Sequence, residues 1–140
     1  MGDVDFELGR AIRHEEGEDL TIIATGSMVH PSLEAATALR KQGYSVGVVD
    51  MHTVKPIDRG EIVSAAERSR RLMTVEEHNV LGGLGGAVAE VLAEEGAIVP
   101  LHRHGIRDIY SLIGPPTHLY GHYQLDADGI AQQARTVLDS

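Results

Sequence analysis

Residues 72–91 read LMTVEEHNVLGGLGGAVAEV, and the rest of the chain is organised around this stretch. A short apolar run ends at charged residues, crosses paired glycines and continues with apolar residues at helical spacing. We interpret it as a strand over residues 72–75, a polar turn and a helix, because glycine lets two backbone segments approach closely. The turn holds the first candidate functional residues, which are Glu76, Glu77, His78, Asn79, Gly82, Gly83, Gly85 and Gly86.

The same alternation of strand and helix recurs along the chain. Apolar, β-branched runs at residues 20–25 and 46–51 are typical of strands buried on both faces, and an amphipathic segment follows each run. Asp58 and Asp126 are predicted to cap helices, and Gly96 is predicted to end one. The alternation predicts parallel strands joined by right-handed crossovers, with helices on both faces of the sheet.

Length and charge pattern indicate how the chain divides. Its 140 residues are about the length of one domain with one core. Residues 1–19 are mostly charged and contain three glycines, so we interpret them as an N-terminal arm or linker before a domain over residues 20–140. Residues 98–101 are a fourth strand candidate, and the region around residues 110–125 is interpreted as an irregular connector.

Composition excludes several classes of function. The formal net charge of −9 disfavours nucleic acid and anionic membranes as partners. The absence of cysteine excludes disulfides, iron–sulfur sites and thiol catalysis. Hydrophobic residues make up 42% of the chain but aromatic residues only 4%, which suits an aliphatic core of helices packed on a buried sheet. With no apolar run near about 18 residues and no signal-like start, we expect a cytoplasmic protein.

Two clusters could contact a ligand. Thr25, Gly26 and Ser27 lie at the end of the first buried run, where the N–H groups of the next helix could hold an anion. Ser27 could equally serve only as a helix cap. Glu76 and His78 offer acid, base and donor groups at the carboxyl end of a strand, where parallel sheets bind ligands, although a surface acidic pair would give the same residues.

Other chemistries fit the sequence poorly. The glycines at 82–86 lack the dinucleotide fingerprint, because the third glycine position is Val88. The histidines at 102, 104, 118 and 122 do not have a known ligand spacing, so we expect solvated loop histidines and no metal site. A nucleophilic triad, a phosphate-binding Walker loop and a paired-carboxylate site are not indicated either.

Several motifs together resemble the C-terminal domain of transketolase-like enzymes. The resemblance extends over nearly the whole chain and is strongest to the C-terminal subunits of split transketolases, with 1-deoxyxylulose-5-phosphate synthase and pyruvate dehydrogenase β subunits as more distant relatives. It rests on DFELGR (5–10), LTIIATGS (20–27), VDMHTVKPID (49–58), TVEEH (74–78), GAVAEV (86–91), GIRDIY (105–110), GPP (114–116) and YQL (123–125).

The resemblance implies a three-layer α/β/α domain with a mostly parallel sheet of about five strands, one of them antiparallel. It also implies a transferase, a thiamine-diphosphate-dependent transketolase, in which this chain is the C-terminal structural and dimer-supporting part. Family enzymes hold thiamine diphosphate and Mg²⁺ between a pyrophosphate-binding and a pyrimidine-binding domain. We expect those domains to be partners of this chain, whether it is a fragment or a separately encoded subunit.

The cofactor motif of the pyrophosphate-binding domain is not matched here, since Gly2-Asp3-Val4 differs from Gly-Asp-Gly. We therefore expect no catalytic, cofactor-binding or metal-binding residue in this chain, and no activity in isolation. On this interpretation the turn from Glu76 to Gly86 meets a neighbouring domain or subunit. The alternatives are a free-standing anion-binding module that uses Thr25, Gly26 and Ser27, and, less favoured, an NAD-linked enzyme.

Overall fold

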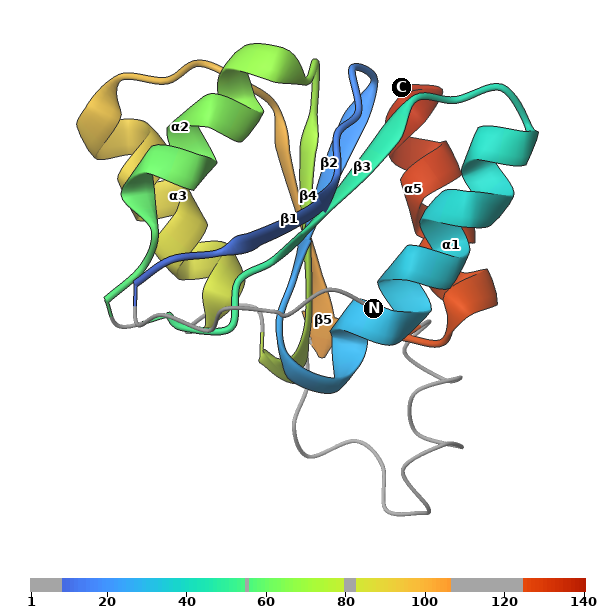
Figure 1. Cartoon of the computed structure of the whole chain (residues 1–140), viewed down its shortest axis with the longest axis horizontal. Helices are drawn as coiled ribbons and strands as arrows, with labels where there is room; N and C mark the ends of the chain where they lie inside the picture. Colours follow the sequence, from blue (N-terminus) through green and yellow to red (C-terminus); the bar gives the residue numbers. More distant parts are fainter. Residues whose placement is uncertain (1–8, 55, 80–82, 107–124) are drawn as a thin grey trace.

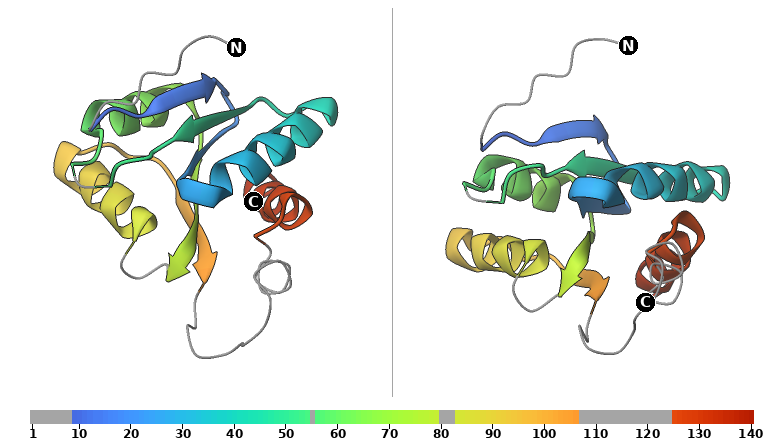
Figure 2. Two further views of the ribbon diagram at one scale, coloured as in Figure 1. Left: turned by 60° about the horizontal axis from the view of Figure 1, so that its bottom comes forward. Right: turned by 90° about the horizontal axis from the view of Figure 1, so that it is seen from below.

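A five-stranded sheet lies between two layers of helices in the computed structural model, which describes residues 9–54, 56–79, 83–106 and 125–140. Helices α1 (Val29–Lys41) and α5 (Ala127–Leu138) cover one face of the sheet. Helices α2 (Arg59–Arg68) and α3 (Leu84–Glu95) cover the other face (Figures 1 and 2). None of the helices in the described ranges is long and apolar enough to cross a membrane.

The sheet has the strand order β1-β3-β2-β4-β5. The strands are β1 (Ile12–Glu15), β2 (Leu20–Ala24), β3 (Val46–Asp50), β4 (Leu72–Asn79) and β5 (Leu101–Ile106). Strand β1 pairs with β3 in antiparallel orientation, whereas the other three pairings are parallel. This confirms the expected three-layer fold with a mostly parallel sheet.

Local sequence signals set one end of each of three helices. Asp58 caps α2 by accepting a hydrogen bond from the Glu61 amide at 3.0 Å, and Asp126 caps α5 by accepting one from the Gly129 amide at 2.8 Å. Gly96 ends α3 in the left-handed conformation, with a φ of 69°. These three predictions are confirmed.

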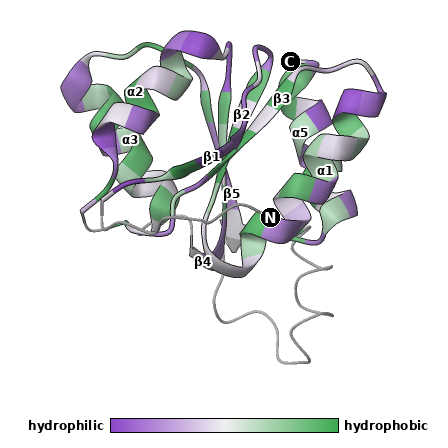
Figure 3. Ribbon diagram, in the orientation of Figure 1, coloured by the Kyte–Doolittle hydropathy of each residue, from purple (hydrophilic) through white to green (hydrophobic). Residues whose placement is uncertain are grey.

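The apolar runs divide their side chains between two cores. Alternation along a strand sends successive side chains to opposite faces, so neighbouring residues of one strand enter different cores. On β2, Ile22 packs with α1 and α5, whereas Ile23 packs with α2 and α3. The green inner faces of the helices in Figure 3 show the same division.

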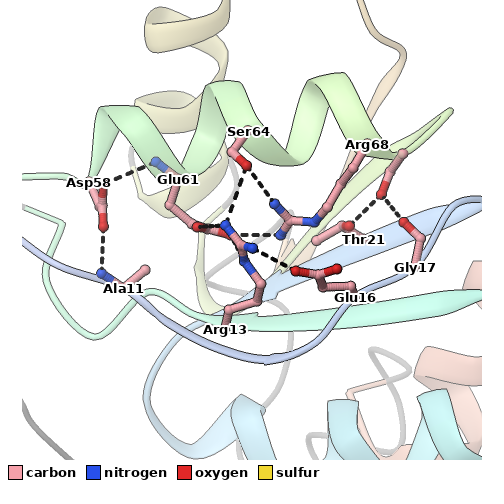
Figure 4. Close-up of polar contacts among 10 residues, drawn as sticks. Ala11, Arg13, Glu16, Gly17, Thr21, Asp58, Glu61, Ser64 and Arg68 are labelled. Carbon is pink, nitrogen blue, oxygen red and sulfur yellow. Dashed lines mark hydrogen bonds and ion pairs between the residues drawn. The ribbon is translucent and has the colours of Figure 1, made fainter.

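Strand β1 lies within the segment that we interpreted as an arm. It pairs only with β3, through backbone hydrogen bonds, and charged contacts join it to α2 (Figure 4). The Ala11 amide donates to Asp58 Oδ2 at 2.8 Å, and Arg13 donates to both carboxylate oxygens of Glu61 at 2.8 and 3.1 Å. Two of its four residues are exposed and only Ile12 is apolar, so hydrophobic pattern alone could not identify this edge strand.

The backbone that leads from β1 toward β2 passes very close to the backbone of β3. A Cβ on Gly17 would lie 2.2 Å from the Gly47 amide nitrogen, and one on Gly47 would lie 2.6 Å from the Glu15 carbonyl oxygen. Real Cβ atoms do not approach this closely, so both positions require glycine for lack of space.

Strand β5 begins where we expected the fourth strand to end. The prediction placed this strand at residues 98–101, but Ile98 is fully exposed and the strand runs from Leu101 to Ile106. The parallel register pairs Leu101 with Leu72, so the first residues of β4 and β5 lie side by side. Apolar character at residues 98–100 was therefore a misleading signal.

Candidate functional site

The carboxyl ends of β2, β3, β4 and β5 meet at one edge of the sheet, at the bottom of Figure 1. The short 3₁₀ helix η1 (Gly26–Met28) follows β2 at this edge, and α3 also begins there. Both candidate clusters from the sequence therefore come together in space, because β2 and β4 are neighbouring parallel strands of the sheet.

The most constrained side chain at this edge is that of Glu76. It lies on the same face of β4 as Leu72 and Thr74, toward α3, and it is 0% exposed. Its two carboxylate oxygens accept hydrogen bonds from the backbone amides of Leu84 and Gly85, each at 2.7 Å. A negative charge at the positive end of a helix dipole is stabilised, so burial of this carboxylate is compensated.

Gly83 makes room for that carboxylate. It occupies the N-cap position of α3, and a Cβ at this position would lie 1.8 Å from Glu76 Oε1. Its φ of −108° is open to any residue, so the requirement for glycine comes from space. Glu76 thus does the capping that the N-cap residue of α3 does not perform.

The expected polar turn from Glu76 to Asn79 is wrong, because all four residues belong to β4. The strand extends past the apolar run since pairing with β5 continues to Asn79, opposite Ile106, after an irregularity. Gly85 and Gly86 lie in the first turn of α3, which leaves only Gly83 of the described residues in the turn. Gly82 lies outside the described residues.

The predicted anion site is next to a carboxylate. Glu77 lies on the opposite face of β4 from Glu76, and a Cβ on Gly26 would lie 3.8 Å from Glu77 Oε1. The Thr25 side chain precedes η1 but makes no capping hydrogen bond, and Ser27 is exposed within η1. Because the N-cap residue of α1 is Met28, Ser27 does not cap α1 as the sequence suggested it could. Because a carboxylate repels an anion, the geometry does not favour the anion-binding alternative.

Asp50, at the carboxyl end of β3, is a polar residue that the sequence interpretation did not single out. Its Oδ1 atom is buried without a hydrogen-bond partner among the described residues. Burial raises the pKa of the Asp50 carboxyl above its usual value, while His52 and His14 act in the opposite direction. An acidic residue near the end of the apolar run at residues 46–51 was the only available signal.

Two of the four histidines considered for metal binding lie on β5, so they are not in a loop as we expected. The His102 and His104 rings stack with centroids 6.4 Å apart, and His104 is buried. His118 and His122 lie outside the described residues. In the described part of the chain, no three His, Asp or Glu side chains are grouped to hold a metal ion.

Two pockets lie at the opposite edge of the sheet, near the amino ends of the strands. One, of about 260 Å³, is lined by Arg71, Pro100, Leu101, His102, Thr136, Val137 and Ser140. The other, of about 450 Å³, is lined by Glu16, Gly17, Glu18, Ser45 and Arg68. Neither includes a residue of the two candidate clusters.

The comparisons with known proteins agree with this geometry. Residues 9–130 match the family described as "Transketolase, C-terminal domain". The chain is 42% identical over 132 residues to one subunit of an apulose-4-phosphate transketolase of Phocaeicola vulgatus, covering 94% of this chain and 42% of that protein. It is 41% identical over 128 residues to a 1-deoxy-D-xylulose-5-phosphate synthase of a Synechococcus strain, covering 91% of this chain and 20% of that protein.

Among solved structures, a split-gene transketolase described as an inactive beta4 tetramer matches with a TM-score of 0.90 and 40% identity. The match covers 97% of this chain and 44% of that chain. The sequence thus spans less than half the length of these relatives. The sequence family, the sheet order and the whole-chain structural match agree, and the chain belongs to the transketolase C-terminal domain family.

Proposed function

We propose that this chain is the C-terminal structural and subunit-interface domain of a thiamine-diphosphate-dependent transketolase, which transfers ketol groups between sugar phosphates. The observation that carries the proposal is that the whole chain matches less than half of a split transketolase chain. In this proposal the cofactor and Mg²⁺ are held by the partner domains, and this chain does not catalyse the reaction alone. The described inactivity of that tetramer supports such a division of labour.

The state of Glu76 also supports a structural role. A general acid or base must come within hydrogen-bond reach of a substrate proton. The Glu76 side chain is fully buried, and its two oxygens accept amide hydrogens of α3. Glu76 therefore stabilises the fold. It is not accessible as the acid or base that the sequence suggested for this cluster.

The carboxyl edge of the sheet is our proposed contact surface for the pyrimidine- and pyrophosphate-binding partners. Here Glu77 and the exposed residues Gly26 and Ser27 come together from neighbouring strands. A charge reversal should act on association and leave the two cores intact, because Glu77 is only half-buried. The proposed complex further contains two copies of this chain.

Co-purification with the polypeptide encoded beside this chain tests the proposal. We expect a tagged chain to retain a partner with a pyrimidine-domain sequence, and transketolase activity to appear only when both are mixed. Glu77→Arg should weaken this association at least tenfold, whereas Glu67→Arg, at an exposed position of α2, should not. Activity of the chain alone, or equal association of both variants, would contradict the proposal.

A further inference from the structure

We propose that Arg103 is a preformed anchor for an aspartate or glutamate side chain of the partner polypeptide. The stem of this arginine is packed against α3, whereas its guanidinium head reaches the surface without an acceptor among the described residues. The inference rests on the proposed function and names one contact of the interface.

The stem of Arg103 is fixed between β5 and α3. Strand β5 is the end strand of the sheet, and the Arg103 side chain lies on the face that α3 covers. A Cβ on Gly85, in the first turn of α3, would lie 2.8 Å from both the Cγ and the Cδ atoms of Arg103. The arginine stem therefore occupies the space that a side chain at residue 85 would fill, and α3 restricts its conformations.

The guanidinium head of Arg103 is accessible and has no partner within the described ranges. It donates no hydrogen bond and forms no ion pair there. Its nitrogen atoms are not among the buried atoms that lack a partner, so they are in contact with solvent. The other half-buried arginines of the described ranges each donate at least one side-chain hydrogen bond; they are Arg40, Arg68, Arg71 and Arg135.

The charge of the chain makes this unpaired arginine unusual. Acidic residues outnumber basic ones by 21 to 12, and carboxylates of the chain pair with Arg13, Arg40, Arg59 and Arg68. The planar donor fork of an arginine matches a carboxylate through two parallel hydrogen bonds. Because the stem of Arg103 is already ordered, such a bond would cost less conformational entropy than one to a flexible surface arginine.

The position of Arg103 fits the proposed contact surface. Its stem lies beside the first turn of α3, and α3 begins at the carboxyl edge of the sheet. A partner that covers this edge can reach the guanidinium head without a change of fold in this chain. Arginine is enriched among the residues that dominate binding energy at protein interfaces.

Association of the full chain with the polypeptide encoded beside it tests the anchor. Arg103→Met keeps an apolar stem and removes the guanidinium head, so Tm should change by less than about 2 °C. The dissociation constant should nevertheless rise about tenfold or more, and by less at high salt. Arg70→Met is the matched control, because Arg70 is exposed and precedes the first residue of β4 at the opposite edge; it should change neither quantity.

Arginine modification by phenylglyoxal, followed by mass spectrometry, gives a second readout that also holds if Arg103→Met is unstable. Arg103 should react in the isolated chain and lose this reactivity when the partner binds, whereas Arg70 should react in both states. Equal affinities of the two variants, or unchanged labelling of Arg103 in the complex, would overturn this inference and leave the proposed function intact. If the wild-type chain does not associate at all, the proposed function fails and this inference falls with it.

Discussion

Gly83→Ala adds a single methyl group at the point where β4 and α3 meet. The new Cβ would lie 1.8 Å from Glu76 Oε1, far inside contact distance, and the neighbouring Cδ would be at 2.9 Å. The Glu76 carboxylate must move away from its present position, because the backbone at residue 83 continues into α3 and cannot shift easily. Both amide hydrogen bonds of Glu76 are then lost.

The magnitude follows from those two bonds. Hydrogen bonds to charged groups contribute about 1.5–3 kcal/mol each, so their joint loss would cost about 3–6 kcal/mol. Water can reach a displaced carboxylate and restore part of this, so we expect the free energy of unfolding to fall by about 3 kcal/mol. Gly60→Ala is the matched control, because its Cβ would meet only Asp58 Oδ1, at an ordinary 3.7 Å. It should be neutral or slightly stabilising, by up to about 1 kcal/mol.

Urea unfolding of Gly83→Ala, Glu76→Ala and the double variant measures the coupling directly. If the cost arises from displacing Glu76, Gly83→Ala should cost less than about 1 kcal/mol once Glu76 is already alanine. A cost below about 0.5 kcal/mol in the wild-type background, or an equal cost in both backgrounds, would refute this reasoning.

Three further changes test the sheet and its edges by the same unfolding measurement. Gly47→Ala should destabilise by about 2–4 kcal/mol, because its Cβ would lie 2.6 Å from the Glu15 carbonyl oxygen. Arg13→Met should cost about 1 kcal/mol at low salt and less at high salt, whereas Arg59→Met, whose partners are exposed, should destabilise clearly less than Arg13→Met. Equal losses would contradict the β1–α2 contact. Burial raises the pKa of Asp50, so its charge opposes folding at neutral pH. Asp50→Asn should therefore stabilise at pH 7, by at most ~0.5 kcal/mol after solvent screening, and this gain should vanish below about pH 4; a loss at pH 7 would contradict the assignment.

The elements with local signals could be predicted from the sequence. The apolar run at residues 20–25 became β2, and the run at 46–51 became β3, since strands buried on both faces need continuous apolar residues. Asp58 and Asp126 capped helices because the capping bond spans only three residues. The family followed from motifs spread along the chain.

The elements stabilised by distant contacts could not be predicted in this way. Strand β1 is joined to α2 through Arg13 and Glu61, which are 48 residues apart. Strand β4 continues through Glu76 because amides of α3 compensate its charge, and a charged residue in isolation indicates a turn. His104 is buried in β5 although it follows a charged residue, Arg103. In each case the tertiary partner reverses the local preference.

Isothermal titration calorimetry with thiamine diphosphate and Mg²⁺ tests the central claim most directly. The central claim is that this chain supports a transketolase without holding its cofactor. We predict no binding heat when the cofactor is titrated into the purified chain, and a saturable signal once the partner polypeptide is added. Tight binding of thiamine diphosphate by the chain alone would contradict the account.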